Sequence, residues 1–242
     1  MKRVLSSIGI GGATVDTVFP RLEFSPGEVV EADVELTGGE TTQEIERIYF
    51  ALKARHPGAD DAARAISEFA VDRAVTLAPE DELTLPAEIA FPYWVPLTRG
   101  DVSVWLETGL EIDWARDPTD EDALELVPDA QTKALFDAVA ELDFELRGST
   151  LEATSFLDDR PFAQKFSFHP TDADYAAELD DIELTILPDA NVLRVFLEID
   201  LVDEVADPRD LDFDEQEIPI TFESADRATM RRRIASEIDQ HV

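Results

Sequence analysis

The chain has 242 residues and 44% hydrophobic residues, enough to bury the core of one large domain or two ordinary ones. Its 55 acidic and 20 basic residues give a formal net charge of -35, a field that repels nucleic-acid phosphates and anionic lipid headgroups. Binding to nucleic acid or to a membrane surface is therefore not expected, and zero cysteines exclude disulfides and thiolate metal sites.

The charge pattern indicates a halophilic, salt-adapted protein. Acidic residues are spread along the chain and interleaved with apolar ones, whereas a disordered acidic tail would need low hydrophobicity. Only four of the 20 basic residues are lysine, at positions 2, 53, 133 and 165. Residues 4–15 are uncharged and follow Lys2 and Arg3, but they form a weak apolar run without a cleavage site. We therefore expect a cytoplasmic protein without membrane insertion.

The first half of the chain carries apolar residues at every second position, with turn residues between the runs. From Val30 to Leu36, apolar and acidic residues alternate between two glycine-containing turns. The runs at 48–54 and 102–114 repeat the pattern, the second over seven alternate positions. Long alternating strands without helices between them are typical of an antiparallel β-sandwich.

At Pro128 the period changes, because Leu135, Val139 and Leu142 recur at helical spacing. This predicts one short helix near 130–141 that begins at Pro128 or Asp129. Strand-like sequence then returns in three runs, at 143–156, 162–168 and 181–187.

The clearest hairpin joins the run that ends at 187 to the alternating run at 193–201, across a turn at 188–191. The acidic stretch 198–217 is expected to form a solvated, partly strand-forming edge, for which weak cation binding is plausible. A second helix is predicted near 225–239, with Met230, Ile234 and Ile238 in one narrow apolar stripe.

Several strings resemble the sporulation-control family of arrestin-like proteins, and the resemblance extends over about residues 1–205. The strings in the first half are 8–13 (IGIGGA), 15–17 (VDT), 26–28 (PGE), 43–49 (QEIERIY), 92–96 (PYWVP), 104–112 (VWLETGLEI) and 117–120 (DPTD). In the second half, 135–146 looks like the family's helix leading into a strand, and 160–170 looks like the strand after it.

The resemblance implies two arrestin-like antiparallel β-sandwich domains, a cytoplasmic location and a regulatory or scaffolding role without known catalytic residues. With the helical pattern, it predicts an N-terminal sandwich at 1–128, a C-terminal sandwich at 129–223 and a helical tail at 224–242. We expect a non-enzymatic adaptor for protein partners. The alternative is an extracellular structural or adhesive module, possibly dependent on cations.

No catalytic, cofactor or metal site is expected from the motifs. The glycines at 9–12 match neither nucleotide-binding fingerprint, and 210–214 (DLDFD) lacks the later positions of a calcium loop. We interpret 117–122 as a turn and not as a ligand set. The three histidines, His56, His169 and His241, lack metal-ligand spacing, and no nucleophile elbow is present.

One basic cluster stands out in this acidic chain: Arg231, Arg232 and Arg233. It serves either as an internal counter-charge or as a docking site for an acidic partner, and both interpretations remain open. Trp94, Trp105 and Trp114 are expected to be packing residues at a domain edge, in preference to a ligand platform.

We predict that folding depends on salt. A net charge of -35 opposes compaction when the Debye length is about 30 Å, at about 10 mM salt, and much less when it is about 3 Å, at about 1 M. Circular dichroism across a potassium chloride series should show a higher thermal midpoint at molar salt. Equal midpoints at both ends of the series would contradict this.

Overall fold

The computed structural model describes residues 12–56, 63–112, 117–153, 160, 162–173, 175–202 and 217–242. Its N-terminal half is built from strands, with the following bounds: β1 (Thr14–Val18), β2 (Glu23–Phe24), β3 (Val29–Thr37), β4 (Gln43–Arg55), β5 (Arg64–Val71), β6 (Val75–Leu77), β7 (Glu82–Ala90), β8 (Ser103–Ile112) and β9 (Thr119–Leu126).

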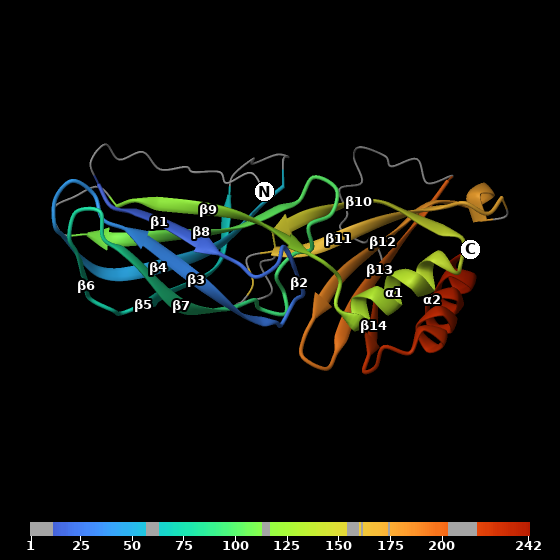
Figure 1. Ribbon diagram of the computed structural model, residues 1–242. Helices are drawn as coiled ribbons and strands as arrows, with labels where there is room; N and C mark the ends of the chain where they lie inside the picture. The colour runs from blue at the N-terminus through green and yellow to red at the C-terminus, as the bar shows by residue number, and fades with distance from the viewer. Residues whose placement is uncertain are drawn as a thin grey trace.

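These strands form a sandwich of two sheets. One sheet has the order β1-β3-β7, and the other has the order β2-β9-β8-β4-β5, with β6 paired to one end of β4. All pairs are antiparallel except the two-residue pairing of β2 with β9. The molecule is elongated, and this sandwich forms one end of it (Figure 1).

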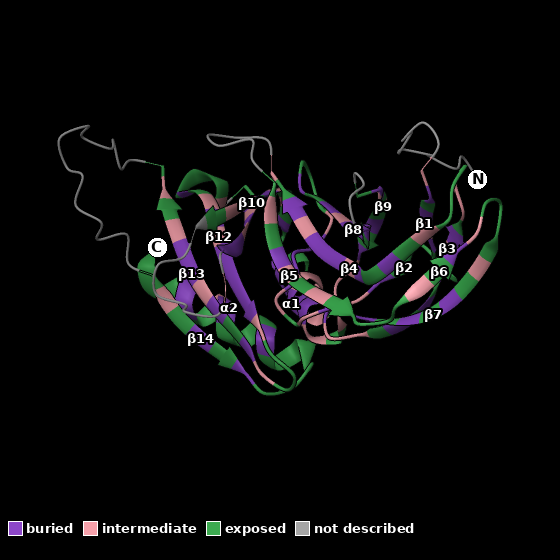
Figure 2. Ribbon diagram, turned by 90° about the vertical axis from the view of Figure 1, so that its left-hand side faces the viewer, coloured by how far each residue is buried: buried purple, intermediate pink, exposed green. Residues whose placement is uncertain are grey.

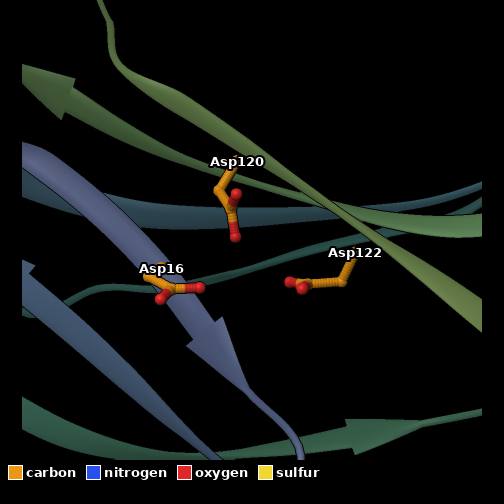
Figure 3. A group of neighbouring side chains, drawn as sticks. All are labelled: Asp16, Asp120 and Asp122. Atoms are coloured by element: carbon orange, nitrogen blue, oxygen red, sulfur yellow. The ribbon is translucent and has the colours of Figure 1, made fainter. Parts of the chain in front are cut away.

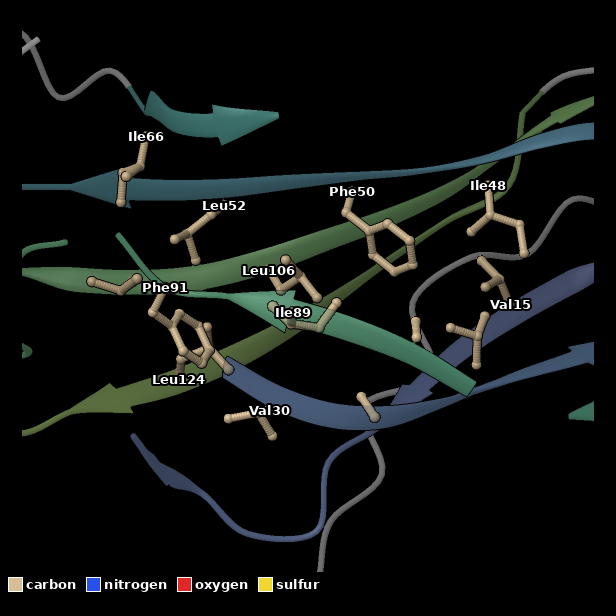
Figure 4. Close-up of a cluster of buried hydrophobic side chains, with 14 of the residues drawn as sticks. Val15, Val30, Ile48, Phe50, Leu52, Ile66, Ile89, Phe91, Leu106 and Leu124 are labelled. Atoms are coloured by element: carbon tan, nitrogen blue, oxygen red, sulfur yellow. The ribbon is translucent and has the colours of Figure 1, made fainter. Parts of the chain in front are cut away.

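The core of the sandwich follows from the period-two pattern of the strands. In β3, buried positions alternate with exposed or half-buried ones along the whole strand. Val30 and Ile89 face the core from one sheet, and Phe50 and Leu106 face it from the other (Figure 4). Each apolar side chain that leaves water contributes about 1.5 to 3 kcal/mol, so this layer stabilises the pairing of the two sheets.

The C-terminal half has one five-stranded antiparallel sheet and two α-helices. The sheet has the order β10-β11-β12-β13-β14. The strands are β10 (Phe144–Ala153), β11 (Phe162–Pro170), β12 (Leu179–Pro188), β13 (Leu193–Leu201) and β14 (Ile218–Phe222), and the helices are α1 (Ala130–Ala140) and α2 (Arg227–His241), with a short 3-10 helix at Tyr175–Ala177. The two α-helices lie side by side against one face of the sheet (Figure 1).

Both helices begin at an aspartate that caps them. The Asp129 carboxylate accepts hydrogen bonds from the backbone N–H groups of Gln131 and Thr132, at 2.7 and 2.9 Å. Asp226 caps α2 in the same way, through the backbone N–H of Ala228. Capping satisfies N–H groups that have no partner within the helix, which explains why the period changes at these residues.

The predicted apolar stripe of α2 packs into the core of the C-terminal half. Met230, Ile234 and Ile238 are completely buried, beside Leu135 and Val139 of α1. The helix is therefore part of this half's core, although the sequence suggested a tail at 224–242.

The predicted fold class is confirmed: the described residues are mostly β, arranged in antiparallel sheets of sandwich type, with two α-helices where they were expected. The hairpin across 188–191 is also present, as β12 and β13. In the C-terminal half, the described residues that pack against the five-stranded sheet belong to α1 and α2. The division at residue 128 stays a prediction.

The surface reflects the charge of the chain. Exposed and half-buried positions interrupt the buried ones along most strands, so acidic side chains reach water on the outer faces (Figure 2). Most of the acidic stretch 198–217 lies outside the described residues. In the part of the chain that is described, neither helix has the length and apolar character needed to cross a membrane.

We predict that Ile234→Ala lowers the free energy of unfolding by about 2 to 5 kcal/mol, because it opens a cavity in a fully buried layer. Arg232→Ala, an exposed change on the same helix, should alter it by no more than about 0.5 kcal/mol. Denaturant unfolding in molar salt measures both. Equal losses would show that α2 is held by something other than its apolar stripe.

Candidate functional site

The two halves meet at the segment that leads from β7 to β8. The Gln164 side chain of β11 accepts a hydrogen bond from the backbone N–H of Leu97 at 2.7 Å and donates one to the Leu97 carbonyl at 3.0 Å. Its amide also donates to Ser149 Oγ at 3.1 Å, and the Ser149 hydroxyl donates to the carbonyl of Arg99. These hydrogen bonds form a buried clamp between residues 67 positions apart.

Apolar side chains surround this clamp. Leu97 belongs to the core of the C-terminal half, whereas Phe162 of β11 belongs to the core of the N-terminal half. Trp94 contacts Phe162 edge to face, with ring centroids 6.1 Å apart. Each half thus inserts a side chain into the other, so the junction is packed like a core.

A small cavity of about 30 Å³ lies at this junction. Pro26, Trp94, Leu97, Arg160 and Phe162 are among the residues that line it. A volume of this size holds about one water molecule, far less than the several hundred Å³ of a typical ligand pocket. The described residues of the junction therefore form a packing seam around a small cavity.

The predicted arginine cluster lies on the solvent side of α2. We call Arg227, Arg231, Arg232 and Arg233 the arginine face. Arg227 forms an ion pair with Glu141 at 3.0 Å, and Arg231 Nε donates to the Glu141 carbonyl at 3.4 Å. Arg233 pairs with Glu237 at 2.7 Å.

Arg232 differs from its neighbours. Its guanidinium donates to Thr229 Oγ1 at 2.9 Å, and no carboxylate of the described chain forms an ion pair with it. The structure thus divides the cluster: Arg231 binds the end of α1, Arg233 binds its own helix, and Arg232 faces solvent.

The tryptophans lie on different elements. Trp94 is at the seam, Trp105 is half-buried on β8, and Trp114 lies outside the described residues. Trp94 contacts Phe162, and among the described residues no aromatic contact joins Trp94 to Trp105.

Two of the histidines, His169 and His241, each contact one acceptor. His169 Nδ1 is 2.9 Å from Asp181 Oδ1, and Ser167 donates to the other oxygen of the same carboxylate at 3.3 Å. A hydrolytic triad needs the serine hydrogen-bonded to the histidine, whereas here both bind the aspartate. His241 contacts the backbone carbonyl of Glu237 at 2.8 Å.

Lys165 occupies the face of the C-terminal sheet opposite the helices. Its ammonium lies 2.8 Å from Glu198, 3.0 Å from Glu183 and 3.5 Å from Glu152. Burial lowers the pKa of Lys165, but the hydrogen bonds to Glu198 and Glu183 more than offset this and raise it overall. The lysine therefore stays charged and joins strands β10 to β13.

Asp16, Asp120 and Asp122 form a carboxylate cluster where the two sheets of the sandwich meet (Figure 3). We expected a turn at 117–122, and this is wrong for 119–122, because β9 begins at Thr119 and pairs with β8. Alternation along β9 points Asp120 and Asp122 to the same face, toward Asp16 of β1. The sequence did not reveal this cluster, because with 55 acidic residues no particular group of aspartates stands out.

Burial raises the pKa of Asp122 to about 8, and the adjacent Asp120 charge adds to the effect. Burial also raises the pKa of Asp120, against the hydrogen bond from the Thr17 backbone N–H. Carboxylate oxygens are the ligands of hard cations, so these three residues are the group in the described chain that could hold a metal ion.

The chain is similar to known proteins over most of its length. The family model described as SpoOM protein matches residues 1–202. The sporulation-control protein spo0M of Bacillus subtilis (strain 168) is 31% identical over 205 residues, which cover 82% of this chain and 80% of that protein. A crystal structure of Spo0M from Bacillus subtilis superposes with a TM-score of 0.85 at 27% identity, covering 96% of this chain and 100% of that one.

We predict that Gln164→Leu lowers the free energy of unfolding by about 2 to 4 kcal/mol, because the Leu97 N–H and carbonyl stay buried without partners. The volume of the side chain is nearly conserved, so packing is a minor factor. Gln240→Leu, an exposed change on α2, is the control and should have little effect. A Gln164→Leu protein as stable as the native one in molar salt would contradict the clamp.

Proposed function

Because the chain belongs to the SpoOM protein family, we propose that it is a cytoplasmic regulatory scaffold that binds protein partners and catalyses no reaction. The named relative is a sporulation-control protein, which supports a regulatory role. The packed junction supports a scaffold, since two halves that share core residues present their surfaces in a constant relative position.

The observation that carries the proposal is the arginine face on α2. Although the protein has a net charge of -35, the 15 residues of α2 include four arginines and only two acidic residues. An acidic protein segment, repelled by most of the surface, would be attracted to this one.

Helix stability does not explain where these arginines lie. The positive end of the helix dipole is at the N-terminus, where acidic residues are favourable and basic ones are not. The first turn of α2 has no acidic residue and begins with Arg227, while the basic residue of the last turn is His241. The arrangement is therefore better explained by what the arginines contact.

The contacts of the four arginines suggest different roles. Arg227 and Arg231 hold α2 against Glu141 at the end of α1. Arg232, without an ion pair in the described chain, is the arginine placed to receive a partner's carboxylate. Arg231 and Arg233 would lie on either side of that contact.

Charge reversal tests the proposal residue by residue. Arg232→Glu should leave the thermal midpoint within about 4 °C of the native value, since exposed ion pairs contribute only about 0 to 1 kcal/mol. It should nevertheless abolish the capture of partners in a crosslinked pull-down at native salt. Arg231→Glu should lower the midpoint, because it removes a contact with α1.

Arg147→Glu is the matched control, because it reverses an exposed charge on β10, away from the arginine face. Its pull-down should equal that of the native protein. If Arg232→Glu keeps every partner that the native chain captures, the arginine face is only a solvated surface and the docking proposal is wrong.

A further inference from the structure

Trp105 lies on the outer face of the larger sheet of the N-terminal sandwich. Its neighbour Leu106 points into the core (Figure 4), so alternation along β8 places the Trp105 side chain on the opposite face. Neither core cluster of the described residues includes this tryptophan. One of the largest side chains of the protein therefore belongs to a sheet surface and not to a core.

The indole nitrogen of Trp105 is nevertheless sealed from solvent. Its Nε1–H group has no hydrogen-bond acceptor among the described residues. A polar group that loses water without gaining a partner costs free energy. A backbone carbonyl of a further segment, placed beside the ring, removes this cost.

The described chain places no further layer of helix or strand over this face. The principal neighbours of β8 are β4 and β9 in its own sheet and β1 across the core. Ala123 of β9 lies opposite Trp105 in the register, and this residue is exposed and too small to cover the ring. The face therefore accommodates an extended segment that follows β8 and β9.

Two glutamates give this part of the face its charge. Glu121 and Glu125 lie on either side of Ala123 on the outer face of β9, and both are exposed. Neither forms an ion pair with a side chain of the described residues. Glu107, opposite Glu121, is already paired with Lys53 at 2.7 Å. A segment with positive charge and no acid is complementary to this position.

Residues 1–11 (MKRVLSSIGIG) have this composition. They include Lys2 and Arg3 and no acidic residue, in a chain with 55 acids. The other residues of the segment are uncharged, and Val4 and Leu5 follow directly after the two bases. The segment thus combines positive charge for the glutamates with apolar side chains for the indole.

The described chain begins close enough to this face for the segment to reach it. Ala13 is buried, and its backbone N–H donates to Gln43 Oε1 at 2.6 Å, at the start of β4. The start of β4 pairs with the end of β8, through Ile45 and Ile112. Trp105 lies seven positions before Ile112 on β8, about 23 Å away at about 3.3 Å per residue. Eleven extended residues span up to about 36 Å, which is enough to turn over the end of the sheet and reach the indole.

We propose that residues 1–11 fold back over the outer face of β8 and β9 and cover Trp105. Gly9 and Gly11 allow the sharp reversal that this path requires, because glycine adopts backbone conformations that are closed to other residues. Val4 and Leu5 then contact the indole, and a backbone carbonyl of the segment accepts its N–H.

The bases at the start of the segment complete the contact. Lys2 and Arg3 lie against Glu121 and Glu125, which have no other cation in the described chain. The segment acts as a built-in cover that keeps the tryptophan face from other chains. The arginine face lies on α2 in the other half of the molecule, so this proposal and the docking proposal succeed or fail separately.

A nitroxide label tests where residues 1–11 lie. The chain has no cysteine, so Ser6→Cys takes the label at one place only. With the full chain in about 1 M potassium chloride, where the general acidic surface is screened, we expect the label to broaden two NMR signals. These are the indole N–H of Trp105, which is identified by its loss in Trp105→Phe, and the amide of Ala123.

Ser236→Cys is the matched control, because it places the same label at an exposed serine on α2, in the other half. It should leave both signals sharp. A mixture of isotope-enriched native chains with unenriched, labelled Ser6→Cys chains reports contacts between copies, and we expect no broadening there. Broadening that appears only in this mixture means that the segment docks on a second copy, and the proposal is then wrong.

Deletion of residues 2–10 gives an independent readout. It should speed hydrogen exchange of the Trp105 indole N–H at least about tenfold, because the cover is lost. The indole of Trp94, at the seam, is the internal reference and should keep its rate. The proposal is overturned if the Ser6→Cys label leaves Trp105 and Ala123 sharp, or if the deletion leaves the exchange rate of the Trp105 indole unchanged.

Discussion

Self-repulsion among 35 uncompensated negative charges is the constraint under which this fold is built. A compact state brings these charges closer together, so each must either reach water or find a cation. The alternating strands meet the first condition, since they turn their acidic positions away from the core. Where the C-terminal sheet buries Glu198, the ammonium of Lys165 lies beside it, whereas Asp16, Asp120 and Asp122 converge without an ion pair among the described residues.

The few basic residues are accordingly used at chosen places. Lys53 pairs with Glu107 across β4 and β8 at 2.7 Å, on the outer face of the larger sheet. Lys165 bonds three glutamates and so joins four strands of the other sheet. Arg227 and Arg231 fix α2 to α1. Arg232 faces solvent without an ion pair in the described chain, and the docking proposal depends on its position between Arg231 and Arg233 on α2.

The junction between the halves combines apolar packing with one buried polar clamp. Phe162 of β11 packs in the core of the N-terminal half, and Leu97 packs in the core of the C-terminal half. Separating the halves would therefore expose both apolar side chains to water, which is unfavourable. Gln164 adds direction to this contact, because its amide bonds both backbone groups of Leu97 and tolerates little rotation. The proposed scaffold role needs such a junction, since partners on one half would otherwise be placed at random relative to the other.

The sequence by itself determined the elements that depend on local periodicity. Apolar positions two apart predicted β3, β4, β8 and the β12–β13 hairpin, and a capping aspartate with helical spacing predicted α1. The apolar stripe of α2 was equally plain, although its burial in a core was not. The quoted strings also indicated the family, and the family model matches residues 1–202.

Only the tertiary structure decided which distant residues meet. Thr17 and Asp120 are 103 positions apart, and Leu97 and Gln164 are 67 apart, so neither pair leaves a periodic trace. Asp120 and Asp122 were misread as part of a turn because an acidic string beside a proline favours one, until pairing with β8 made it a strand. Local patterns report which face of a strand is buried, whereas the sheet that closes over that face is set by long-range packing.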